Sequence, residues 1–262
     1  MALPAISGYS MPTTDGLPAN TLSGPVHPSR AALLIHDMQN HFLAPFERDR
    51  SPLTELLTNI GRLRNLCHTV GIPVVYSTQP GGQSARERGL LREMWGNGIA
   101  GDGIGDRIVE DLTPRPGDIC LTKYRYSAFF GTDLHEQLIR AGRDQLIICG
   151  IYAHIGCLAT ACDAFMRDIR PFMVSDAVAD FDAEHHHTAL CWAAKRCAVV
   201  ESTATVLGAL QAATDNVPPT EPEHSTRTAA EPTGEPNHSH GRDRPLNIEA
   251  VDSLHVATQR PH

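Results

Sequence analysis

The sequence is short of positive charge and has no long apolar run. Its 22 Lys and Arg residues are outnumbered by 30 Asp and Glu residues, which gives a formal net charge of -8. Nucleic-acid binding requires clustered positive charge, and the chain has no basic stripe, so we expect no nucleic-acid partner. No apolar run approaches the roughly 20 residues that a membrane-spanning helix needs. Residues 1–29 also lack the basic and apolar regions of a secretory signal, so we expect a soluble, cytoplasmic protein that does not bind membranes.

Signs of a disulfide framework are missing as well. The seven cysteines are odd in number, form no CxxC pair and mostly lie inside apolar runs. Such cysteines are typical of small, reduced core residues in a cytosolic protein. They are Cys67, Cys120, Cys149, Cys157, Cys162, Cys191 and Cys197.

Two motifs resemble cofactor-binding sites, but the sequence around each of them does not fit such a site. The segment Gly96–Gly101 satisfies GxGxxG, but it follows Met94 and Trp95 rather than a buried strand and opens no helix, which excludes dinucleotide binding. Consecutive histidines occur at 185–187, and consecutive residues on a helix point in different directions, so they cannot ligate one ion together. We expect neither a metal nor an organic cofactor.

Short apolar runs alternate with helical patterns through the middle of the chain. Apolar residues spaced by three and four predict a helix over 53–70, and similar patterns predict further helices. Repeated strand and helix units indicate a parallel sheet with helices on both faces. The predicted fold is therefore α/β, with three layers and a mostly parallel six-stranded sheet. Its strands are predicted over 31–36, 72–77, 118–122, 145–149, 172–175 and 198–202, and its other helices over 133–141, 156–168 and 183–194.

The two ends of the chain differ from this middle part. Residues 1–29 are rich in Pro, Ser, Thr and Gly, which indicates an extended arm that lies on the domain or on a partner subunit. Residues 213–262 scatter prolines among polar residues and cannot bury enough apolar surface to offset the cost of ordering. We therefore predict a catalytic domain over 30–212 followed by a disordered tail.

Polar side chains follow three of the predicted strands. Asp37 comes after the first, Gln79 after the second and Lys123 after the third, while the loop 152–156 follows the fourth. The carboxyl ends of parallel strands share one edge of a sheet, and ligands bind there. The helix that starts after the loop would add N–H groups that attract anions. The sequence therefore predicts a site at this edge.

Four long motifs carry a family resemblance. They are the runs Leu33–Asn40, Lys123–Phe129, Gly150–Cys157 and Asp163–Phe172. In this order they resemble the isochorismatase branch of the cysteine-hydrolase superfamily, over roughly residues 5–212.

The resemblance implies particular catalytic residues. Asp37 and Lys123 match the family's Asp and Lys, and the position of its nucleophilic cysteine falls on Gly156. Cys157 lies one residue late and would point toward packing, so we expect it to be structural.

The resemblance also implies the reaction, which is hydrolysis of isochorismate to 2,3-dihydro-2,3-dihydroxybenzoate and pyruvate. The substrate is an enol ether with two carboxylates, and its hydrolysis begins with protonation of the vinyl carbon, for which Asp37 is the candidate acid. A free Asp has a pKa of about 3.9, so burial must raise the pKa of Asp37 while Lys123 opposes this. We hypothesise that bound substrate engages Lys123. Gly156 would supply room and a close backbone approach.

Further pocket residues are implied in the same way. Gln79 and Arg88 resemble the residues that bind the substrate carboxylates, and Arg suits a planar carboxylate. Tyr152 and the Gly156 amide would bind polar atoms. Three aromatic residues would wall the pocket and exclude water, namely Phe42, Trp95 and Tyr126.

Several alternatives stay open. The substrate is either isochorismate, on a route to a siderophore or another aryl-capped metabolite, or 2-amino-2-deoxyisochorismate, on a phenazine or hydroxyanthranilate route. A cysteine amidohydrolase would require Cys157 to act, and a non-catalytic interaction protein would fold without turning over either substrate. The arm and the family's habits suggest a homodimer or larger homo-oligomer.

Overall fold

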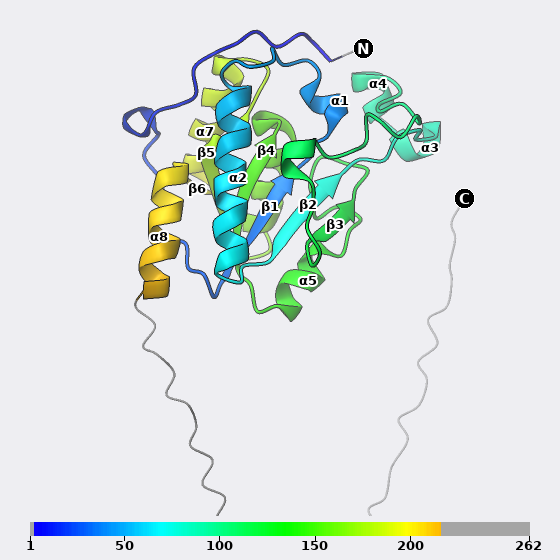
Figure 1. The fold of residues 1–262 in the computed structure, drawn as a ribbon. Coiled ribbons are helices and arrows are strands. Elements are labelled where there is room, and N and C mark those ends of the chain that lie inside the picture. The colour runs from blue at the N-terminus through cyan, green and yellow to red at the C-terminus, as the bar shows by residue number, and fades with distance from the viewer. Residues whose placement is uncertain (1–2, 216–262) are drawn as a thin grey trace, which may run out of the picture. The chain divides into compact units, whose positions relative to one another are not determined.

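The computed structural model describes residues 3–215, and a single six-stranded parallel sheet organises them (Figure 1). The strand order is β3-β2-β1-β4-β5-β6, and every neighbouring pair is parallel. This confirms the predicted α/β class and the number of strands. The strands are β1 (Ala31–His36), β2 (Val74–Thr78), β3 (Ile119–Thr122), β4 (Gln145–Ile151), β5 (Arg170–Ala179) and β6 (Val199–Glu201).

The central strand β1 shows why both faces of the sheet are covered. Successive side chains of a strand point to opposite faces. Leu33 and Ile35 belong to one buried cluster, whereas Ala32 and Leu34 belong to the other. A strand that is apolar on both faces needs a layer of helices on each side.

The helices divide between the two faces accordingly. Apolar residues of α2 (Leu53–Thr69) and α8 (Thr203–Asp215) pack into the first cluster, and both helices lie in front of the sheet in Figure 1. The second cluster takes its helical residues from α5 (Leu134–Arg140), α6 (Leu158–Phe165) and α7 (Ala183–Arg196). The three-layer prediction is therefore confirmed.

Some elements differ from the predicted ones. The predicted helix over 156–168 is split, because a π-helical turn over Ala153–Cys157 precedes α6 and Asp168 lies beyond its end with a φ of 58°. Short helices that lack a repeated apolar pattern were not predicted. They are α1 (Asn40–Leu43), α3 (Ala85–Arg88), α4 (Leu91–Trp95) and two 3₁₀ turns, Thr14–Gly16 and Glu110–Leu112.

Helix α8 was not predicted, and it continues to Asp215, past the predicted end of the catalytic domain at 212. Its residues Val206, Leu207 and Leu210 are buried in the first cluster, and this spacing holds the helix against the sheet. The remainder of the predicted disordered tail, residues 216–262, lies outside the described residues. None of the helices over 3–215 is long and apolar enough to cross a membrane.

The N-terminal arm packs on its own domain. Ile6 is buried and pairs with Phe46 through a β-bridge, and Val26 is also buried. The side chain of Asn20 exchanges two hydrogen bonds with the backbone of Val200 at the edge strand β6. The arm was predicted to lie on the domain or on a partner subunit, and its described residues lie on the domain.

Candidate active site

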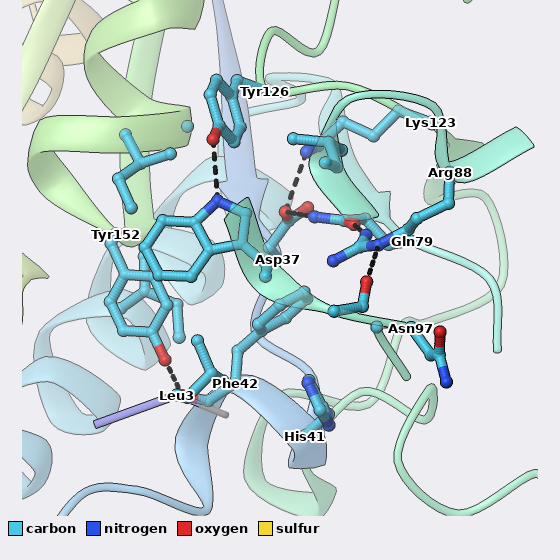
Figure 2. A pocket seen from close by; sticks show the side chains of 17 residues that line it. Leu3, Asp37, His41, Phe42, Gln79, Arg88, Asn97, Lys123, Tyr126 and Tyr152 are labelled. Carbon is cyan, nitrogen blue, oxygen red and sulfur yellow. Dashed lines mark hydrogen bonds and ion pairs between the residues drawn. The ribbon is translucent and has the colours of Figure 1, made fainter. Parts of the chain in front are cut away.

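Asp37 and Lys123 form a buried ion pair at the carboxyl ends of β1 and β3. Lys123 Nζ lies 2.8 Å from Asp37 Oδ2 and also donates to the carbonyl oxygen of Arg125 at 2.9 Å. The Lys123 side chain is fully buried and that of Asp37 is 7% exposed. Figure 2 shows the Asp37 carboxylate between the side chains of Lys123 and Gln79, and Asp37 lines a cavity.

The Asp37 carboxylate accepts from two more side chains. Ser77 Oγ donates to Oδ1 at 2.9 Å, and Gln79 Nε2 donates to Oδ2 at 3.2 Å. Burial raises the pKa of Asp37, but the charges of His36 and Lys123 and the hydrogen bonds from Lys123 and Gln79 together lower it by more. The pKa of Asp37 therefore lies below its usual range, and the carboxyl group is ionised at neutral pH.

Gln79 links this ion pair to Arg88. Its Oε1 accepts from Arg88 Nη1 at 3.2 Å, while its Nε2 donates to Asp37. Arg88 also donates through Nε to the carbonyl oxygen of Gly96 and is 4% exposed. Among residues 3–215 it forms no ion pair with a carboxylate. A buried, unneutralised guanidinium beside a cavity favours an anionic ligand.

Local sequence explains how Arg88 is held. Ser84 and Glu87 form a capping box that starts α3, so Arg88 occupies the last position of this single-turn helix. Gly98 of the GxGxxG segment packs against the guanidinium, since a Cβ at this position would lie 2.8 Å from Arg88 Cζ. The lack of a side chain at Gly98 therefore leaves room for the guanidinium of Arg88.

Aromatic side chains wall the other side of the cavity. Trp95 Nε1 donates to the hydroxyl of Tyr126 at 2.7 Å, which leaves the Tyr126 proton available to a ligand. The hydroxyl of Tyr152 donates to the carbonyl oxygen of Phe42 at 2.6 Å. Its proton is therefore committed, and Tyr152 offers its ring rather than the polar donor that the sequence suggested. Phe181, which was not predicted, supports the wall through ring contacts with Trp95 and Tyr152.

The loop after β4 carries no nucleophile. Gly156 faces the cavity, and the next residue, Cys157, is fully buried in the second core cluster. Burial raises the pKa of the Cys157 thiol well above its usual range, so it is a poor nucleophile. The expectation that Cys157 is structural agrees with this burial.

All nine predicted site residues line one cavity of about 270 Å³. This volume suits a small ligand with a single ring. The nine are Asp37, Phe42, Gln79, Arg88, Trp95, Lys123, Tyr126, Tyr152 and Gly156; the other lining residues are Leu3, His41, Leu91, Gly96, Asn97, Gly98, Ile151 and Ile155. None of these lining residues is a cysteine, serine or threonine.

Two residues in contact with the catalytic groups were missed by sequence reasoning. Ser77 lies two positions before Gln79, and residues two apart on an extended chain share a face, so the placement of Gln79 could have revealed it. His36 ends β1 beside Asp37 with its ring fully buried, and no pattern in the sequence marks which way that ring points.

The consecutive histidines point apart, as predicted. His185 pairs with Asp182, His186 contacts the carbonyl oxygen of Ser175, and His187 contacts Cys191. Across residues 3–215 no group of three or more His, Cys, Asp or Glu side chains is arranged to hold a metal.

Several known proteins resemble this chain in sequence or in fold. The isochorismatase domain model matches residues 31–205. An isochorismatase of Bacillus subtilis is 52% identical over 217 residues, which cover 83% of this chain and 70% of that protein. A phenazine biosynthesis protein of Pseudomonas aeruginosa is 46% identical over 205 residues, which cover 78% of this chain and 98% of that protein. A crystal structure of a cysteine hydrolase from Pseudomonas syringae has a TM-score of 0.68 over 73% of this chain and 97% of that one, and at 24% identity it supports the fold alone.

Proposed function

Because the chain belongs to the isochorismatase family, we propose that it hydrolyses the enol ether of isochorismate to pyruvate and 2,3-dihydro-2,3-dihydroxybenzoate. The observation that carries this proposal is a buried acid that is paired with one cation and linked to a second through Gln79, in a cavity without a nucleophile. Asp37 is the acid, Lys123 and Arg88 are the cations, and Gly156 occupies the position of the nucleophile.

The charges of the cavity suit a dicarboxylate. The cations Lys123 and Arg88 outnumber the single ionised carboxylate of Asp37, and the pKa of His41 is lowered by burial and by Arg88, which keeps that ring neutral. A dianionic substrate would therefore compensate the excess positive charge. Arg88 uses one N–H each on Gly96 and Gln79, so its remaining N–H groups can donate to a substrate carboxylate.

Substrate binding resolves the opposition between Asp37 and Lys123. In the free protein the charge of Lys123 helps to hold Asp37 ionised. Two substrate carboxylates bring negative charge close to Asp37 and attract the ammonium of Lys123. Both effects raise the pKa of Asp37, so the productive complex carries one more proton than the free protein.

The reaction then needs no covalent intermediate with the protein. Protonated Asp37 transfers its proton to the terminal vinyl carbon, which leaves an oxocarbenium ion at the pyruvyl carbon. Water adds to this carbon and returns a proton to Asp37, giving a hemiketal. The hemiketal collapses to pyruvate while the ring oxygen takes the remaining hydroxyl proton and leaves as an alcohol. The aromatic wall of Trp95, Tyr126 and Tyr152 limits the access of bulk water to the cation.

The same hydrolysis of 2-amino-2-deoxyisochorismate is the second candidate. The likeness to a phenazine biosynthesis protein supports it, whereas the likeness to an isochorismatase supports the first. The two substrates differ at one ring substituent, which is a hydroxyl group in isochorismate and an amino group in the analogue. Either reaction would proceed in the cytoplasm and use neither metal nor organic cofactor.

The test is pyruvate release from isochorismate and from 2-amino-2-deoxyisochorismate, measured side by side with an Asp37→Ala control. We expect release with one substrate and its loss in the control, and the preferred substrate then identifies the pathway. Release from neither substrate by folded protein would contradict the proposal and favour an interaction protein or an amidohydrolase. If a Cys157→Ala variant still turns over its substrate, a cysteine amidohydrolase that uses Cys157 is excluded.

A further inference from the structure

The ring of His36 fills the space that a side chain at position 156 would need. A Cβ built on Gly156 would lie 2.2 Å from His36 Cε1, 2.9 Å from Nε2 and 3.0 Å from Nδ1. Contacts below 3.0 Å require one of the two groups to move. The His36 side chain is fully buried, so it has no open space into which to move freely.

The same ring joins three segments of the site. His36 Nδ1 lies 2.9 Å from the carbonyl oxygen of Ile151, at the end of β4, and Nε2 lies 3.1 Å from that of Tyr126, in the loop after Lys123. His36 Nδ1 is also 3.7 Å from Asp37 Oδ1. The ring therefore bridges the two loops that flank the carboxylate and contacts the carboxylate itself.

We propose that His36 is a positioning residue that takes the place of the missing side chain at position 156 and holds Asp37 between the Tyr126 and Ile151 loops. This inference rests on the proposed function, because its catalytic consequence is the aim of the Asp37 proton at the vinyl carbon. It adds a structural reason why this site does not hold a nucleophile, since a side chain at 156 and the ring of His36 exclude each other.

The proposal depends on the shape and burial of the ring, which are the same in its neutral and protonated states. Carbonyl oxygens can only accept, so the ring donates through one nitrogen when neutral and through both when protonated. Burial lowers the pKa of His36, as does the charge of Lys123, while Asp37 opposes both. A protonated ring donates to both carbonyl oxygens and a neutral ring to one of them, and in either state the ring occupies the space beside Gly156.

A double-variant cycle at positions 36 and 156 tests the proposal. We expect Gly156→Ala alone to displace the ring and lower kcat by about 10²-fold with little change in KM, because small misplacements of a catalytic group reduce turnover by such factors. His36→Ala alone should also lower kcat. In His36→Ala/Gly156→Ala the added methyl group has room, so its further effect on kcat should fall to about threefold or less.

Two outcomes would overturn the proposal. One is a Gly156→Ala variant with wild-type kcat, and the other is a double variant whose loss equals the product of the two single losses. The matched control is Leu33→Ala/Gly156→Ala, because Leu33 is equally buried in β1 but belongs to the core cluster on the opposite face. In this control the effect of Gly156→Ala on kcat should be as large as in the wild-type background. If His36→Ala fails to fold, His36→Asn keeps a donor group on a smaller side chain and serves in its place.

A thermal measurement keeps this inference separate from the proposed function. Gly156→Cys should lower the melting temperature, and His36→Ala/Gly156→Cys should recover part of that loss because the thiol then occupies the vacated space. This readout requires no substrate. Absence of pyruvate release together with thermal recovery would reject the enol-ether reaction but retain the placement of His36, whereas a double variant that melts below both single variants would reject the placement.

Discussion

The two ends of β1 carry ion pairs of similar geometry and very different surroundings. Before the strand, Arg30 Nε lies 2.7 Å from Asp144 Oδ1, and the two side chains are 49% and 51% exposed. After the strand, Lys123 Nζ lies 2.8 Å from Asp37 Oδ2, and the side chains are 0% and 7% exposed. Similar contacts are thus made in water at one edge of the sheet and in the protein interior at the other.

The difference teaches what each pair does. The exposed pair keeps most of its hydration and contributes little to stability. The buried pair has lost its hydration, and apolar residues of similar volume would often be no less stable in its place. We therefore assign the buried pair a role in catalysis rather than in stability. A carboxylate whose pKa rises when the ligand binds can act as an acid in the complex.

The sharpest way to break the comparison is to neutralise the carboxylate in each pair. Asp37→Asn should lower kcat by about 10²–10⁴-fold, because the amide cannot supply a proton to carbon. Steady-state pyruvate release measures this effect, and circular dichroism checks that the variant is folded. Near-normal turnover in Asp37→Asn would show that another group is the acid.

Removing the cation of the buried pair should have the next largest effect. Lys123→Met leaves Asp37 buried without its counter-ion, which should lower the free energy of unfolding by about 3–5 kcal/mol. Denaturant titration gives this value. A variant as stable as the wild type would mean that water reaches Asp37, contrary to its 7% exposure.

The pH dependence of turnover tests the protonation state of Asp37 in the buried pair. The lowered pKa of Asp37 makes it a carboxylate in the free protein at neutral pH, whereas the productive complex needs it protonated. kcat/KM should therefore fall about tenfold per pH unit as the pH rises above this pKa, and it should level off below the pKa. Stability has the opposite sign, because the lowered pKa contributes stability that is lost as the pH falls through it.

Calorimetry provides a direct check on that proton. Binding of a dianionic, non-reactive substrate analogue, followed in buffers of different ionisation enthalpy, should show uptake of one proton near neutral pH. The Asp37→Asn variant should show none. Binding without proton uptake in the wild type would mean that the proton moves to Asp37 within the site rather than from solvent.

The smallest effect is expected at the exposed pair. Asp144→Asn should leave kcat unchanged and shift the melting temperature only slightly, because both partners are well hydrated. Calorimetric melting and pyruvate release test this in parallel with Asp37→Asn. A large loss of activity in Asp144→Asn would show that the two ends of β1 are coupled.

Much of the fold and the site could be predicted, because the spacing of apolar residues marks the strands and helices and the ends of parallel strands mark the site. The apolar run at 31–36 gave β1, and Asp37, Gln79 and Lys123 could be placed at one edge without knowledge of the side-chain directions. The orientation of His36 could not be predicted, because it depends on a contact with Gly156, which is distant in the sequence. Helix α8 was missed because its alanine-rich pattern is weak until it packs on the sheet.

The most direct test of the account is the fate of the ether oxygen. The reaction is run in water labelled with oxygen-18, and the ring product is analysed by mass spectrometry. If Asp37 protonates the vinyl carbon and water adds to the pyruvyl carbon, the ring hydroxyl keeps the original oxygen and the ring product is unlabelled. Label in the ring hydroxyl would mean that water attacks the ring carbon instead, and it would contradict the role that we assign to Asp37.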